Sequence, residues 1–227
     1  MVKVKNIVLV HGFWIDASSY SEVISTLLAE GYEVIAVQNP LTSLADDIAA
    51  TKRALNRIEG QCILVGQSWG GMVISEVGND ERVSGLVYIA ALAPDAGESM
   101  IDLMSKYESA SPSEHFQEQE GFIWISKAGV QTILAGDISA EKSALMYATQ
   151  NPPSTSLLEA KIDLPAWKNK PSWYIIANND KAVSPELQHD LAKRINAKTI
   201  VLESSHVPMI SRAKEVVEVI REAAMNS

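Results

Sequence analysis

Residues 66–70 of the sequence, Gly-Gln-Ser-Trp-Gly, match the pattern G-x-S-x-G and place Ser68 between two glycines. Chance alone produces such a match in roughly one chain in ten of this length. An apolar run precedes the motif and a helical pattern follows it, which is the context of a strand-to-helix elbow that exposes a nucleophilic serine. We therefore interpret Ser68 as a nucleophile. The alternative is a Gly/Ser-rich turn that serves only packing.

A serine is a poor nucleophile unless a base lies within hydrogen-bonding reach, and the sequence offers four histidines. His206 follows the predicted strand 198–203 on the loop before the last predicted helix, and we assign it as the base. His189 falls inside a predicted helix and His115 in a polar stretch, where surface positions are the default. His11 ends the first predicted strand, and we expect it to bond loop backbone as a structural histidine.

An acid must orient the base and stabilise the imidazolium that forms during the reaction. Asp180 ends the predicted strand that precedes His206 in the sequence, and we assign it this role. Asp95 follows another predicted strand and stays open as the alternative, because an acid there could reach the same histidine. Glu203 is too close to the end of its own strand to face the imidazole easily. Loop solvation or helix capping is the alternative role for each acid.

An oxyanion hole requires two backbone N–H groups, because amides need no reorganisation when charge develops. The amide of Trp69, directly after the serine, is the first candidate. The second is expected from the loop His-Gly-Phe-Trp after the first strand, at Phe13, where Gly12 lets the backbone come close.

Methionine and aromatic side chains between residues 100 and 167 suggest an apolar pocket for small or medium acyl or alkyl groups. The candidate substrate-binding residues are Trp14, Trp124 and Tyr147. Core packing is the more common role of such residues.

Six apolar runs predict the strands that must position these side chains: 6–10, 33–38, 62–66, 83–94, 172–180 and 198–203. Helices are predicted between them from apolar stripes and from N-capping patterns that begin at Ser19, Ser43 and Ser184. Alternation with short connections predicts an α/β fold, with a mostly parallel, doubly wound sheet of about six strands and helices on both faces.

The alternation of strands and helices breaks at residues 95–170. This segment is polar at first, then has patchy helical stretches, and contains no convincing buried strand. A structureless loop of that length would be anomalous in a compact domain. We therefore predict an α/β core from residues 1–94 and 171–227, with 95–170 as an inserted helical cap or lid.

The composition is ordinary for one globular domain: 227 residues, 47% hydrophobic and 21% charged. With a net charge of −9 and no cluster of Lys and Arg, nucleic acid and anionic membranes are not expected partners. No apolar run approaches the ~18 residues of a membrane span. The single cysteine, Cys62, fits a reducing compartment. We predict a cytoplasmic protein, and the sequence leaves its oligomeric state open.

Five motifs together carry a family resemblance: VLVHGFW, VGQSWGG, AALAPDAGES, IANNDKAVSPE and SSHVPM. With them the chain resembles the α/β-hydrolase superfamily, in the style of its small bacterial hydrolases and more distantly of the plant methylesterase and hydroxynitrile-lyase group. The resemblance implies the fold and the triad but no particular substrate. One departure concerns Gln67, because many relatives have histidine before the nucleophile. We expect this difference to tune the elbow and not to abolish activity.

These residues predict a serine hydrolase that cleaves a small or medium carboxylic ester through an acyl-enzyme, with Ser68, His206 and Asp180 as its triad. The expected partner is a small-molecule ester, with neither a cofactor nor a metal. Hydroxynitrile lyases of the superfamily use a similar site for C–C chemistry, but they typically carry a lysine beside the histidine, where this chain has Val207. Perhydrolysis and a non-catalytic ligand-binding role are further alternatives.

Overall fold

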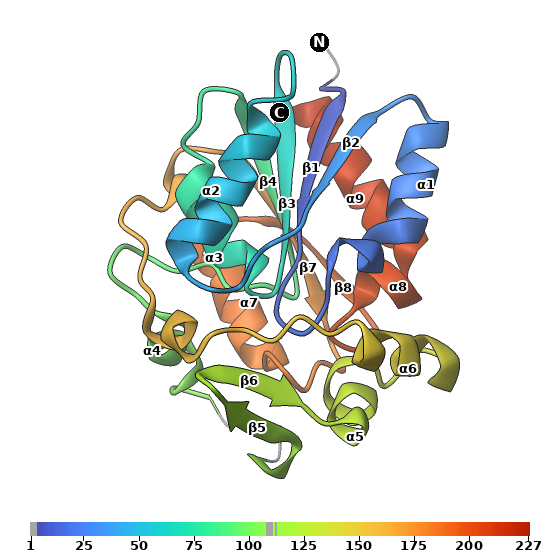
Figure 1. The fold of residues 1–227 in the computed structure, drawn as a ribbon. Coiled ribbons are helices and arrows are strands. Elements are labelled where there is room, and N and C mark those ends of the chain that lie inside the picture. The colour runs from blue at the N-terminus through green and yellow to red at the C-terminus, as the bar shows by residue number, and fades with distance from the viewer. Residues whose placement is uncertain (1–3, 108–110, 112) are drawn as a thin grey trace.

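The computed structural model describes residues 4–107, 111 and 113–227. Its centre is a six-stranded parallel sheet with the strand order β2-β1-β3-β4-β7-β8 (Figure 1). The strands are β1 (Asn6–Val10), β2 (Glu33–Val37), β3 (Cys62–Gln67), β4 (Val83–Ile89), β7 (Ser172–Ala177) and β8 (Lys198–Leu202). This sheet confirms the predicted α/β fold class.

The central strands of the sheet are apolar along their whole length because both of their faces are covered. Every residue of β3 and β7 is buried, and most of β1 and β4 is buried too. The edge strands β2 and β8 are mostly exposed or half-buried. The strand that leads to Ser68 therefore lies in the most buried part of the sheet.

Helices cover both faces of the sheet, as a doubly wound fold requires. One face packs against α2 (Leu44–Leu55), α3 (Gly70–Val77) and α7 (Pro185–Arg194). The other face packs against α1 (Ser21–Ala29) and α9 (Ala213–Asn226), which lie side by side (Figure 1). None of the helices in the described part of the chain combines the length and apolar character that crossing a membrane would need.

The helix starts follow the capping patterns at two of the three expected positions. The side chains of Ser43 and Ser184 accept N–H groups from the first turns of α2 and α7. The predicted cap at Ser19 is wrong. The carboxylate of Asp16 caps a preceding 3₁₀ turn instead, so that α1 begins only at Ser21.

Most of the segment 95–170, predicted as an inserted helical cap, lies at the edge where the parallel strands end, and its last residues return to the opposite end of the sheet, where β7 begins (Figure 1). Residues 108–110 and 112 of this segment lie outside the described residues. Its helices are short, and its longest is α6 (Ala140–Ala148). The remaining short helical elements of the chain are α4 (Met100–Met104), α5 (Lys127–Gly129), α8 (Pro208–Ser211), η1 (Ala17–Tyr20), η2 (Ser113–His115), η3 (Val130–Leu134), η4 (Thr155–Glu159) and η5 (Ala166–Lys168).

The same segment holds a feature that the sequence pattern did not predict, an antiparallel hairpin of β5 (Phe116–Gln119) and β6 (Phe122–Ile125). Most residues of its strands are exposed or half-buried, so the continuous apolar run that marks a buried strand is missing. Its two turn residues, Glu120 and Gly121, have φ angles of 53° and 79°. Positive φ at both central residues is what a tight type I′ hairpin turn demands.

Candidate active site

Ser68 lies between the end of β3 and the start of α3 with a φ of 52°, in the left-handed region that side chains other than glycine rarely adopt. This conformation costs about 1 kcal/mol, and hydrogen bonds hold it. The Ser68 amide donates to the carbonyl of Ile89 at 3.1 Å, and the Leu92 amide donates to the Ser68 carbonyl at 3.1 Å. A strained strand-to-helix turn of this kind is the geometry of a nucleophile elbow.

The glycines of the motif allow the elbow to pack tightly. A Cβ on Gly70 would lie 2.3 Å from the carbonyl oxygen of Val10, and a Cβ on Gly66 would lie 2.6 Å from the carbonyl oxygen of Gly70. Both separations are far below van der Waals contact. The start of α3 therefore rests directly on the end of β1, and any side chain at these two positions would force the serine to move.

His206 and Asp180 form a buried pair on the loops after β8 and β7. Nδ1 of His206 lies 2.7 Å from Oδ2 of Asp180, and each residue is 4% exposed. The other oxygen of Asp180 accepts the amides of Ala182 at 2.7 Å and Val183 at 3.1 Å. Because Nδ1 faces a carboxylate, this nitrogen donates, and Nε2 is left as the nitrogen that can accept a proton.

The carboxylate of Asp180 is held further by Gln188 of α7. The Gln188 amide donates to Oδ2 of Asp180 at 2.8 Å, while its oxygen accepts the Ala177 amide at 2.9 Å. Gln188 thus connects the acid to the end of β7. Sequence reasoning missed this residue because nothing in a helix surface pattern identifies its partner.

Asp95, the alternative acid, lies elsewhere. Its carboxylate pairs with the ammonium of Lys168 and also accepts the Ala96 amide at 2.7 Å. The Lys168 ammonium holds the pKa of Asp95 below its usual value. The structure therefore brings Asp180, and not Asp95, to the histidine.

His11 is fully buried and bonds the backbone of two loops. Its Nε2 accepts the Asn39 amide at 2.9 Å, and its Nδ1 donates to the carbonyl of Gly12 at 2.8 Å. Burial lowers its pKa below the ordinary value of 6.5, so the ring is neutral at pH 7. Of the other histidines, His115 bonds the hydroxyl of Ser126 at 3.0 Å and His189 is exposed on α7.

The loop after β1 runs directly past the serine. A Cβ on Gly12 would lie 2.6 Å from Cβ of Ser68, so only glycine permits this approach. The next residue, Phe13, stacks its ring on that of Trp69 with a centroid distance of 5.0 Å and an angle of 24°. The two backbone segments expected to supply oxyanion donors are thus tied together by their side chains.

Gln67, the departure noted in the motif, bridges the loops on either side of the serine. Its Oε1 accepts the Gly12 amide at 3.2 Å, and its Nε2 donates to the carbonyl of His206 at 2.9 Å. The side chain is completely buried. It therefore fixes the loop after β1 relative to the loop that carries the histidine.

The three candidate substrate-binding residues occupy different environments. The indole of Trp14 donates to the carbonyl of Ile123 at 2.8 Å and packs against Phe116, so it joins the loop after β1 to the hairpin. Trp124 on β6 is 41% exposed and Tyr147 on α6 is 40% exposed. Their role in binding stays a prediction.

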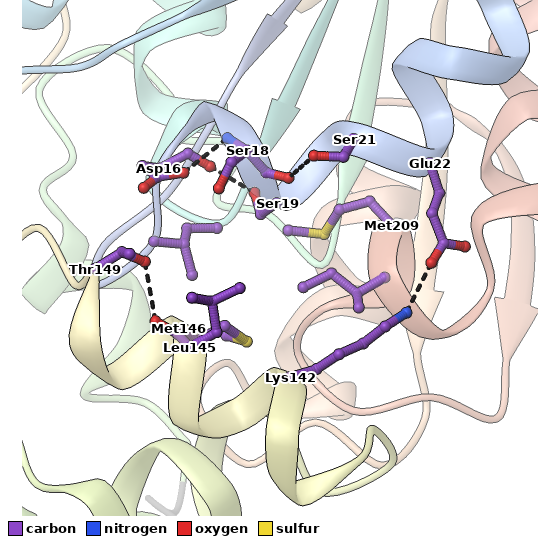
Figure 2. A pocket seen from close by; sticks show the side chains of 12 residues that line it. Asp16, Ser18, Ser19, Ser21, Glu22, Lys142, Leu145, Met146, Thr149 and Met209 are labelled. Atoms are coloured by element: carbon purple, nitrogen blue, oxygen red, sulfur yellow. Dashed lines mark hydrogen bonds and ion pairs between the residues drawn. The ribbon is translucent and has the colours of Figure 1, made fainter.

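A pocket of about 180 Å³ opens between η1, α6 and α8, and none of those three aromatic residues lines it (Figure 2). Its apolar lining consists of Ile15, Leu145, Met146, Met209 and Ile210. Ile15 follows the loop after β1, and Met209 lies on α8, directly after the histidine loop. None of the triad residues lines this pocket. The sequence predicted an apolar pocket formed by residues 100–167 and named Tyr147 of α6 as a lining residue. In the structure, Leu145 and Met146 of that helix line the pocket instead.

The polar rim of this pocket is closed at one side by an ion pair. The ammonium of Lys142 lies 2.7 Å from a carboxylate oxygen of Glu22, which connects α6 to α1 (Figure 2). Both side chains are about half exposed. Such an exposed pair adds little stability, so it leaves the pocket mouth easy to open.

Relatives of the chain include named hydrolases. A pyrethroid hydrolase of Sphingobium wenxiniae is 25% identical over 260 residues, covering 97% of this chain and 88% of the relative. A carbendazim hydrolyzing esterase of a Nocardioides species is 30% identical over 115 residues, which is 44% of this chain and 48% of the relative.

The fold recurs in solved structures. Polyneuridine aldehyde esterase matches with a TM-score of 0.82 at 20% identity, covering 97% of this chain and 99% of that chain. The model of the alpha/beta hydrolase family matches residues 7–219. The chain therefore belongs to the alpha/beta hydrolase family.

Proposed function

We propose that the protein is a serine esterase that hydrolyses a small or medium carboxylic ester with Ser68, His206 and Asp180. The observation that carries the proposal is the 2.7 Å contact between His206 Nδ1 and Asp180 Oδ2, at the sheet edge where Ser68 occupies a strained turn. An imidazole oriented by a carboxylate, at the same sheet edge as a serine in a strained strand-to-helix turn, is the arrangement of a serine hydrolase.

In the proposed reaction, Nε2 of His206 takes the hydroxyl proton as Oγ of Ser68 attacks the ester carbonyl. Asp180 remains ionised and stabilises the imidazolium. The amides of Trp69 and Phe13 bind the tetrahedral oxyanion. His206 then protonates the departing alcohol, which leaves an acyl group on the serine. Water repeats the sequence with the same base, releases the acid and restores the serine.

Membership of the alpha/beta hydrolase family and similarity to a carbendazim hydrolyzing esterase support an ester as the substrate. The pocket of about 180 Å³ suits one apolar end of that ester. A cavity of about 150 Å³ is large enough for benzene, so the pocket accommodates a group of about that size. Val207, directly after the histidine, is buried and apolar, which favours hydrolysis over a lyase reaction that uses a lysine there.

Labelling with a fluorophosphonate probe, combined with a chain-length panel of nitrophenyl esters, tests this function. The wild type should be labelled and should hydrolyse the short esters. Ser68→Ala should lose both properties, and Asp180→Asn should lower kcat by several orders of magnitude because the imidazole loses its orienting acceptor.

Asp95→Asn is the matched control and should keep a near-normal rate. Unchanged labelling of Ser68→Ala would remove the serine from the mechanism. Equal losses in Asp95→Asn would move the orienting role away from Asp180. A cyanohydrin run beside the esters separates lyase from esterase activity, and a wild type that binds but turns over none of them would be a binding protein.

A further inference from the structure

Asp47 is a completely buried carboxylate in the first turn of α2. It does not cap the helix, because the side chain of Ser43 does so. One oxygen of Asp47 accepts the backbone amide of Leu41 at 2.9 Å, and the other accepts the indole N–H of Trp69 at 2.8 Å. A buried charge is costly unless it is hydrogen-bonded, so these two contacts are what keep it in place.

The pKa of Asp47 reflects both its burial and its hydrogen bonds. Burial raises the pKa of its carboxyl to about 6, while the hydrogen bonds from Leu41 and Trp69 act in the opposite direction. The carboxylate is thus ionised at pH 7, where both N–H groups donate to it. Hydrogen bonds to an ionised acceptor are roughly twice as strong as neutral ones.

The Trp69 indole, which donates to Asp47, is 1% exposed and stacks on the ring of Phe13. The ring of Phe13 in turn packs edge-on against Trp14 with a centroid distance of 5.7 Å. A single chain of contacts therefore runs from the Asp47 carboxylate through Trp69 to Phe13. Trp69 and Phe13 are the two residues whose backbone amides are proposed to bind the oxyanion.

We propose that Asp47 is a positioning residue of the oxyanion hole, which holds the Trp69 indole and, through the ring stack, the Phe13 backbone. The inference rests on the proposed esterase function. Loss of one oxyanion donor typically lowers kcat by about 10²–10³-fold. Partial displacement of two donors should have an effect of similar kind but smaller size.

Asp47→Asn tests the inference because asparagine keeps the shape but offers one acceptor oxygen to two N–H donors. We expect kcat for nitrophenyl acetate to fall about 10- to 100-fold while KM stays within about twofold, since the lost interaction is made only in the transition state. The affinity for a trifluoromethyl ketone, which forms a tetrahedral adduct, should fall by the same factor.

Trp69→Phe provides the second arm, because it keeps a ring for stacking and removes the indole donor. It should reproduce the loss in kcat. The double variant should have about the same kcat as the more impaired single variant, because both changes break the same contact. If Asp47→Asn does not fold, Trp69→Phe decides alone, since it leaves the bond between Asp47 and Leu41 intact.

Asp46→Asn is the matched control, one residue away on the same turn and exposed, and it should keep wild-type kinetics. Wild-type kcat and ketone affinity in folded Asp47→Asn or Trp69→Phe would overturn the inference, whatever their thermal stability. Failure of the esterase proposal has a different signature, because the wild type itself would then be inactive and unlabelled.

Discussion

Gln67 contacts both loops that flank the nucleophile, and it does so with opposite ends of one amide. Its oxygen accepts an N–H from the loop after β1 and its nitrogen donates to the carbonyl of His206. A histidine at this position cannot present the same donor and acceptor with the same reach. The residue that the motif marks as unusual is therefore a link between the two loops.

Gln67→Met removes both hydrogen bonds while keeping the length of the side chain. The buried Gly12 amide and His206 carbonyl lose their partners, so the free energy of unfolding should fall by about 1–3 kcal/mol for each of the two groups. The rate constant kcat should fall about tenfold or more because both loops gain freedom. Urea denaturation and steady-state kinetics measure the two effects. The same substitution at exposed Gln61 should change neither, and unaltered kinetics in Gln67→Met would contradict the proposed link.

The sequence predicts Ser68 and His206 as nucleophile and base because each belongs to a local motif at the end of a predicted strand. It favours Asp180 as the acid but leaves Asp95 open, since both follow strands that end at the same edge. The choice depends on Lys168, which lies 73 residues from Asp95 and pairs with it. Asp47 escaped notice for the same reason, because its partner Trp69 belongs to another element.

Strands and helices with regularly spaced or continuous apolar residues could be predicted from the sequence, whereas strands made mostly of polar residues could not. The six strands of the sheet and most of the helices that cover it follow from such periods and from caps. The β5–β6 hairpin does not, because its exposed polar strands lack an apolar run and its turn provides the only local signal. Likewise, the sequence predicted only patchy helical stretches within 95–170, and the placement of α6 there depends on contacts with η3 and on the ion pair to α1.

Narrowing the pocket against α6 should change the choice of ester. Met146→Trp places a bulky indole in the pocket in place of a thioether chain. The value of kcat/KM for esters with aromatic or hexyl groups should therefore fall about tenfold or more. The value for acetate esters should stay close to that of the wild type. The measurement is the chain-length panel of nitrophenyl esters.

Tyr147→Ala serves as the matched variant on the same helix, because Tyr147 is 40% exposed and does not line the pocket. If the pocket binds the ester, this variant leaves the panel unchanged, whereas binding by the Tyr147 ring predicts a loss. A uniform loss in both variants, independent of chain length, would count against the pocket as the binding site. A selective loss only in Tyr147→Ala would assign the role to the exposed ring.

At the scale of the whole molecule, two buried groups couple folding to pH with opposite signs. The pKa of His11 lies below its unfolded value of 6.5, so the folded protein binds fewer protons than the unfolded chain at slightly acidic pH. Its contribution to stability is complete above pH 6.5 and is lost as the pH falls. The pKa of Asp47 is raised from 3.8 to about 6, so its contribution to the free energy of unfolding increases as the pH falls from about 6 to 3.8.

His11→Asn isolates the first of these effects because Asp47 remains in both proteins. Between about pH 7 and 5, the free energy of unfolding of the wild type should fall more steeply than that of the variant, by up to about 1.4 kcal/mol per pH unit. Urea denaturation across this range measures the slopes. His189→Asn, at an exposed position, should keep the wild-type slope. Parallel slopes for wild type and His11→Asn would refute a neutral, buried imidazole.

The strand order also bears on how the enzyme is made. The strand that leads to Ser68 pairs with its neighbours β1 and β4 from the first part of the chain, whereas the bond from Gln67 to His206 spans 139 residues. During synthesis, the serine, its glycines and the loop after β1 emerge well before the acid and the base. We therefore expect a growing chain to acquire its shape before its reactivity. With the proposed triad, a chain built in this order has a reactive serine only once the last strand has docked.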